Sequence, residues 1–91
     1  MNTKEKVKNQ IDEMDDQIGV WEARMESIKA EVRAQYREKL AALKVKRNEM
    51  KIKYDELADS TEDKWEEAKV VFSSASESFK EGFSKLKSLL D

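Results

Sequence analysis

Hydrophobic residues in the first third of the chain recur at alternating spacings of four and three. The stripe begins at Val7 and continues without interruption to Val32, which is more than three heptads. This spacing keeps one face of a helix apolar and is typical of a coiled coil. The members of the stripe are Val7, Ile11, Met14, Ile18, Trp21, Met25, Ile28 and Val32.

The stripe changes frame near Gln35, where the next two positions of the first frame are polar. A four-residue step of this kind is a stutter, which unwinds a supercoil locally and need not interrupt the helix. Residues 29–43 are mostly strong helix formers, so we predict one coiled-coil-type helix over 3–58. The second frame contains Tyr36, Leu40, Leu43, Met50, Tyr54 and Leu57, with Arg47 at the seam position before Met50.

Polar residues at 59–61 predict a break after this long helix. Asp59, Ser60 or Thr61 could cap a second helix, and acidic residues follow in what would be its first turn. A turn here would fold the second helix back as a helical hairpin. In the alternative, the helix runs through 59–61 and forms an extended rod. We favour the break and expect an amphipathic helix over 61–90.

The second helix has its own apolar stripe, and aromatic residues dominate it. A helix with such a face is not stable when that face is exposed to water. Coverage by the first helix or by a partner chain is one interpretation, and insertion into a membrane interface is the other. The residues of this partner or membrane face are Trp65, Phe72, Phe79, Phe83, Leu86 and Leu90, with Ala68 and Ala75 between them.

Composition places the whole chain, 1–91, in the all-α class as a single unit. There is no proline, there are two glycines, and 42% of the 91 residues are charged. Since only 38% are hydrophobic, the core of a single chain would be thin. We therefore expect a homo-oligomer. No apolar run approaches the roughly 18 residues of a membrane span, and the start lacks a signal-peptide pattern, so we take a cytoplasmic location as the default.

The charges form three blocks of alternating sign. Residues 12–31 carry seven acidic and two basic side chains, residues 33–53 carry eight basic and two acidic ones, and residues 55–67 are again acidic. Two copies of the first helix that run antiparallel and cross near residue 33 would place acidic beside basic blocks in both halves. A parallel pair would place like charges together, so we favour an antiparallel dimer.

The residue types needed for most catalysis are missing. Histidine and cysteine are absent, which removes the commonest general base, thiolate chemistry and most transition-metal ligands. The carboxylates of 12–16 fall on a solvated helix face with no glycine-containing loop for a hard cation. The basic block is flanked by acidic ones, so we do not expect nucleic acid as a partner. We expect no enzyme, cofactor, metal or small-molecule substrate.

Several segments resemble a group of small bacterial proteins described as coiled-coil or stress-response family members. They are Tyr36–Leu43, Lys46–Glu49, Tyr54–Leu57 and Thr61–Ala68, followed by the Phe-rich stretch from Phe79 to Leu90. The resemblance implies a non-enzymatic bacterial protein with a link to stress, and it brings no catalytic residues. The sequence thus predicts a structural or interaction protein that works as a helical homo-oligomer. The alternative is a peripheral membrane-binding protein that uses residues 65–90.

Overall fold

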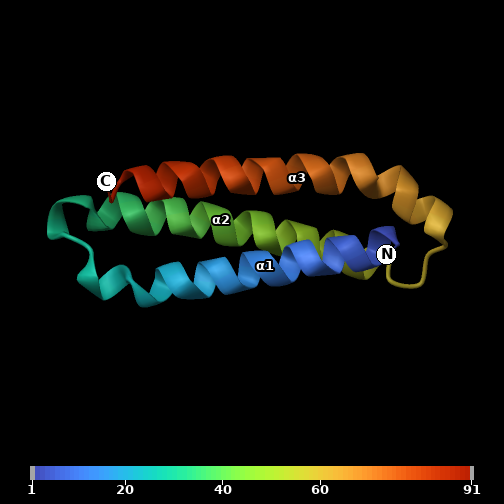
Figure 1. Cartoon of the computed structure of the whole chain (residues 1–91), viewed down its shortest axis with the longest axis horizontal. Coiled ribbons are helices and arrows are strands. Elements are labelled where there is room, and N and C mark those ends of the chain that lie inside the picture. The colour runs from blue at the N-terminus through green and yellow to red at the C-terminus, as the bar shows by residue number, and fades with distance from the viewer. Residues whose placement is uncertain (1, 91) are drawn as a thin grey trace.

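The computed structural model describes residues 2–90, which form an antiparallel bundle of three helices (Figure 1). Helix α1 spans Thr3–Ala23, α2 spans Ala30–Glu56 and α3 spans Glu62–Ser88, and the short 3-10 turn η1 spans Met25–Ser27. The bundle measures 48 × 20 × 19 Å. The end of α3 lies beside the connection between α1 and α2. The predicted all-α class is confirmed, in the folded-back arrangement rather than as an extended rod.

The prediction of one helix over 3–58 is wrong, because the chain reverses between Ala23 and Ala30. Arg24 still has helical torsion angles, φ −80° and ψ −11°. Ile28 and Lys29 are extended, with ψ of 136° and 141°. No described residue has a positive φ, so this turn needs neither glycine nor proline, the residues that would have marked it in the sequence. The frame change near Gln35 thus accompanies a chain reversal and not a stutter.

Side chains hold this turn in place. The Ser27 hydroxyl donates to the Arg24 carbonyl at 2.8 Å, and the Arg33 guanidinium donates to the Ile28 carbonyl at 2.9 Å. The hydroxyl of Tyr36 donates to the carbonyl of Trp21, in the last turn of α1. The final carbonyls of a helix have no partner within that helix. Tyr36 of α2 therefore satisfies one of the final carbonyls of α1, and Arg33 of α2 binds the turn itself.

The predicted break at 59–61 lies in the turn between α2 and α3. The Ser60 amide donates to the Leu57 carbonyl at 2.9 Å, and Thr61 occupies the N-cap position of α3 without a side-chain capping bond. Two carboxylates, Glu62 and Asp63, lie in the first turn of α3, where the positive end of the helix dipole stabilises them.

A single core runs along the bundle and takes one apolar stripe from each helix. Large aromatic residues meet in it: Trp21 packs edge-on against Phe83 with centroids 5.1 Å apart, and Trp65 stacks on Phe72 at 5.7 Å. The buried hydrophobic residues are Val7, Ile11, Met14, Ile18, Trp21, Ile28, Tyr36, Leu40, Leu43, Met50, Trp65, Ala68, Phe72, Phe79 and Leu86.

Candidate functional site

The predicted oligomer seam is the core of one folded chain. Most of its residues are buried against the other two helices of the same chain, and Met25, Val32, Tyr54 and Leu57 are partly buried against them. In the folded bundle the seam packs against helices of its own chain, because the reversal between α1 and α2 and the folding back of α3 supply the partner helices. That the seam also joins two chains stays a prediction. The heptad periodicity predicted which residues are buried, but it does not determine whether the helices that bury them belong to the same chain.

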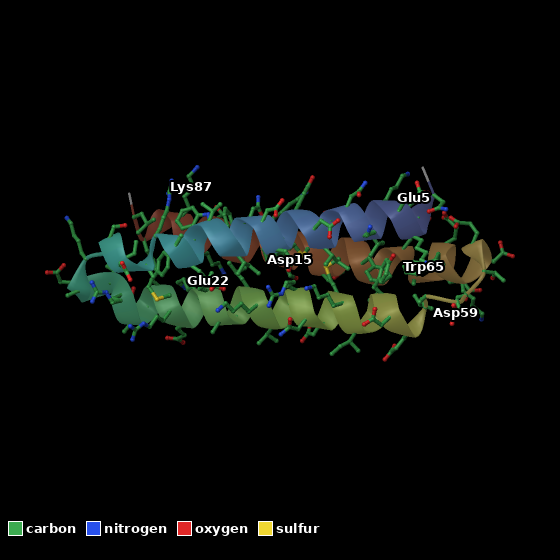
Figure 2. All side chains as sticks on the ribbon, turned by 90° about the horizontal axis from the view of Figure 1, so that it is seen from below. Glu5, Asp15, Glu22, Asp59, Trp65 and Lys87 are labelled. Atoms are coloured by element: carbon green, nitrogen blue, oxygen red, sulfur yellow. The ribbon has the colours of Figure 1, made fainter. Side chains whose placement is uncertain are left out.

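The predicted partner or membrane face is likewise inside the bundle. Trp65, Phe72, Phe79 and Leu86 are each at most 2% exposed, and Phe83 and Leu90 are partly buried against the same core. Figure 2 shows Trp65 within the bundle, whereas Lys87 on the same helix points outward. This face covers α1 and α2, in agreement with the first of its two interpretations, coverage by the first helix.

Acidic and basic blocks meet in an antiparallel arrangement within one chain. Asp15 of α1 accepts a hydrogen bond from Arg47 at 3.2 Å and forms an ion pair with Lys51 at 3.1 Å. Glu22 forms an ion pair with Lys44 at 2.8 Å. These side chains are between one-fifth and one-half exposed, so each pair adds only a modest stabilisation. Their direction still matters, since they favour α1 beside α2 in this orientation.

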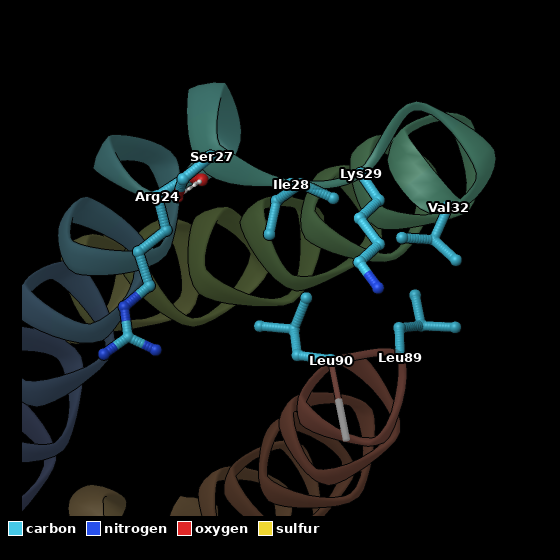
Figure 3. Close-up of a pocket in the computed structure, with 7 residues that line it drawn as sticks. All are labelled: Arg24, Ser27, Ile28, Lys29, Val32, Leu89 and Leu90. Atoms are coloured by element: carbon cyan, nitrogen blue, oxygen red, sulfur yellow. Dashed lines mark hydrogen bonds between the residues drawn. The ribbon is translucent and has the colours of Figure 1, made fainter.

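A crevice of about 500 Å³ lies at the end of the bundle where the chain reverses (Figure 3). Ile28 and Val32 face the two C-terminal leucines across the gap, and Lys29 points into it. Arg24 lies at the side of the crevice, with its guanidinium 5.0 Å from the ring centroid of Trp21. The lining residues are Arg24, Ser27, Ile28, Lys29, Val32, Leu89 and Leu90.

Among residues 2–90, the side chains that line the crevice supply apolar surface and positive charge and form no acid–base pair. Ser27 lines it, but the Ser27 hydroxyl already donates to the carbonyl of Arg24. A nucleophilic serine needs a neighbouring general base, and none of the lining residues is a histidine or a carboxylate. Within residues 2–90, no group of three or more acidic side chains is arranged to hold a metal ion. The crevice could not be predicted from the sequence, because it depends on the reversal at 24–29.

Tyr36 is the one described residue with a clear pKa shift. Burial of its side chain raises the pKa of the phenol above 10.0, and the nearby positive charge of Arg24 partly opposes this. The hydroxyl is fixed on the carbonyl of Trp21 in the core. The Tyr36 hydroxyl therefore stabilises the fold.

The outer face of α2 carries a second, shorter apolar stripe. Val45 is 54% and Ile52 60% exposed, and Ala41 and Asn48 lie on the same face at steps of four, three and four. Lys44 and Lys51 flank this face on one side, and Glu49 and Glu56 flank it on the other. The spacing is visible in the sequence, but the stronger core stripe of the same helix obscures it.

Within the described chain, no helix is both long and apolar enough to cross a bilayer. Comparison with family models, with curated proteins and with solved structures found no match for this chain.

Proposed function

We propose that this protein is a non-catalytic interaction protein that self-associates through the outer face of α2. The observation that carries the proposal is the exposed stripe of Ala41, Val45, Asn48 and Ile52. The core residues of α2, such as Leu43 and Met50, lie on the opposite face. The stripe is therefore available without any change in the fold.

The spacing along the stripe is that of a parallel coiled coil. Val45 and Ile52 occupy one core position of the heptad, and Ala41 and Asn48 occupy the other. Val45 and Ile52 are the β-branched residues that parallel dimers favour at the first core position. The second position holds Ala41 and the polar Asn48 where such dimers usually have leucine, which weakens the pair. The expected partner is therefore a second copy of α2 that runs in the same direction.

The charges beside the stripe favour the same arrangement. In a parallel pair, Lys44 of one copy faces Glu49 of its partner, and Lys51 faces Glu56. An antiparallel pair would place lysines against lysines and glutamates against glutamates. The stripe extends over only about two heptads, so we expect a weak, concentration-dependent dimer. The role in stress that the family resemblance implies is part of this proposal.

The membrane alternative has less support. It requires residues 65–90 to expose Trp65, Phe72 and Phe79, each of which fills the core. A membrane-bound form would first have to open the bundle. Co-flotation of the intact chain with anionic vesicles at neutral pH would favour that alternative over self-association.

The proposal is tested by sedimentation equilibrium over a wide concentration range. The wild-type chain should show reversible dimerisation, and Val45→Glu combined with Ile52→Glu should remove it. The matched control is Val70→Glu on α3, where a valine that is 75% exposed lies off the stripe. The control should dimerise like the wild type. Equal dimerisation of all three proteins would contradict the proposal.

A charge variant tests the direction of pairing. Glu49→Lys with Glu56→Lys turns both attractive contacts of the parallel pair into repulsive ones, so the dimer should weaken several-fold at low salt. Salt screens contacts between exposed charges, and the difference should shrink at high salt. A stronger dimer would indicate the antiparallel arrangement instead.

A further inference from the structure

The groove between α2 and α3 accepts α1, and the polar contacts that join α1 to these two helices do not involve the connection at 24–29. At the start of α1, the Thr3 amide donates to Glu62 at 3.1 Å, and the Lys4 ammonium donates to the Ala58 carbonyl at 2.8 Å. Further along, the Asp15 and Glu22 carboxylates meet basic side chains of α2. The α1 helix of a second chain could make every one of these contacts.

We propose that two copies of this chain exchange α1, so that the segment 24–29 straightens and joins α1 and α2 into one helix. Each α1 then fills the groove between α2 and α3 of the other copy. Exchange of an identical element between protomers is a low-cost route to a dimer, because the contacts of the monomer are re-formed. The surface involved is the core groove, which is distinct from the outer face of α2.

The backbone of the reversal is close to helical already. Arg24 has helical torsion angles and Met25–Ser27 form a 3-10 turn, which differs little from an α-helix. Ile28 and Lys29 are extended, with φ of −80° and −58° and ψ near 140°. Rotation of these two ψ angles is the main change that a continuous helix requires. Neither glycine nor proline is present in 24–29 to oppose it.

A straight helix would present the same faces in both of its halves. Asp15 and Lys51, which pair across α1 and α2, are 36 residues apart, about ten turns at 3.6 residues per turn. They would therefore point to the same side of the straight helix. Gln10 and Lys46, which line hollows against α3, are also 36 residues apart. One continuous helix can thus face a partner helix on one side and an α3 helix on another along its whole length.

The charge pairs place a twofold axis at the reversal. The midpoint between Asp15 and Arg47 is residue 31, and the midpoint between Glu22 and Lys44 is residue 33. Two straight helices that cross there antiparallel would re-form both pairs between chains. The charge blocks favour antiparallel pairing of residues 12–31 with residues 33–53. In the monomer this pairing forms within one chain, and in the exchanged dimer it forms between two chains.

In this arrangement the crevice at the end of one bundle lies against the same crevice of the second copy. Two bundles would meet end to end at the twofold axis, and the aliphatic residues around the gap of Figure 3 would cover their counterparts. Val32, Leu89 and Leu90 are each only partly buried in the monomer. Their burial in the dimer would extend the core through the centre.

The decisive variant is Lys29→Pro. Proline fixes φ near −65° and requires an extended residue before it, and Lys29 with φ −58° after an extended Ile28 meets both conditions. The monomer should therefore tolerate the substitution, whereas proline inside a continuous helix is strongly unfavourable. Lys29→Ala is the matched control, because it removes the same charge and side chain without the ring.

The experiment is refolding at high protein concentration, followed by size-exclusion chromatography with light scattering. The wild type and Lys29→Ala should give a fraction at twice the 10.6 kDa chain mass, which dilution does not dissociate for hours, and Lys29→Pro should not. Small-angle scattering of this fraction should give a longest dimension of about twice the 48 Å of the monomer. A Lys29→Pro dimer with the same yield and length would overturn the proposal.

A crosslinking arm distinguishes exchange from contact at the outer face of α2. Chains with Asp15→Cys and chains with Lys51→Cys are refolded together and treated with a short bismaleimide. Exchange brings the two cysteines of different chains together, and heterodimer crosslinks should form. They should persist when Val45→Glu and Ile52→Glu are added, and Lys29→Pro should abolish them. A dimeric sample without these crosslinks would overturn exchange and leave the outer-face proposal standing.

Discussion

The hydroxyl of Tyr36 donates a hydrogen bond to the main-chain carbonyl of Trp21, which ties the second turn of α2 to the last turn of α1. Tyr36 is fully buried and Trp21 is 7% exposed. Because the two residues lie on either side of the chain reversal, this bond joins the two helices at the point where the sequence alone predicts a continuous one.

Tyr36→Phe should lower the free energy of unfolding by about 1–2 kcal/mol. The substitution keeps the ring and leaves a carbonyl in the core without its partner, and an unsatisfied buried acceptor costs about 1–3 kcal/mol. Urea denaturation at pH 7 measures the difference. Tyr54→Phe is the control, since Tyr54 is a partly buried seam tyrosine whose ring should pack as before. An unchanged stability of Tyr36→Phe would show that the bond contributes nothing.

The raised pKa of Tyr36 predicts a loss of stability at alkaline pH. Its contribution is complete below the ordinary value of 10.0. Above that pH the unfolded chain loses the phenolic proton while the folded chain retains it, so stability falls until the raised pKa is passed. All other side chains are common to the two proteins, so their contributions cancel in the comparison. Denaturation at pH 9 and pH 11 should therefore show a steeper loss for the wild type than for Tyr36→Phe.

The two glycines should respond differently to alanine. A methyl group at Gly19 would meet no atom within 4 Å, whereas one at Gly82 would lie 2.9 Å from Cδ2 of the buried Leu43. Both substitutions gain about 1 kcal/mol of helix propensity. Only Gly82→Ala has to displace a core side chain, and overpacking of this kind costs about 1–3 kcal/mol. Thermal denaturation should rank Gly19→Ala above the wild type and Gly82→Ala below Gly19→Ala.

Most of the core could be predicted from the sequence, because burial follows the helical period whatever the topology. Val7, Ile18, Leu40 and Phe72 all came from such patterns and all are buried. The break at 59–61 was visible for a related reason, since capping residues and acidic residues cluster there.

The topology could not be predicted, because the determinants of the reversal are tertiary. The residues of 24–29 have no turn signature, and the bonds that hold the turn come from Arg33 and Tyr36 of the next helix. Complementary charges are satisfied equally by a reversal within one chain and by pairing between two chains. They therefore predicted that the helices run antiparallel, but not whether the partner helix belongs to the same chain. The crevice depends on the topology, and only the topology shows that the outer stripe of α2 is left uncovered in the bundle.

Asp15 is the residue whose removal should most clearly show what the charge pairing contributes. It accepts a hydrogen bond from Arg47 at 3.2 Å and forms an ion pair with Lys51 at 3.1 Å. The carboxylate is 34% exposed, which limits each contact to the few tenths of a kcal/mol of a surface pair. Asp15→Asn should therefore lower the free energy of unfolding by about 0.5–1 kcal/mol at low salt, and by less at 1 M salt, where the Debye length is about 3 Å. Asp16→Asn is the matched control: Asp16 is the next residue, it is exposed, and no ion pair joins it within the described chain. Equal effects of the two substitutions would mean that the net charge of the acidic block matters and the contacts across α1 and α2 do not.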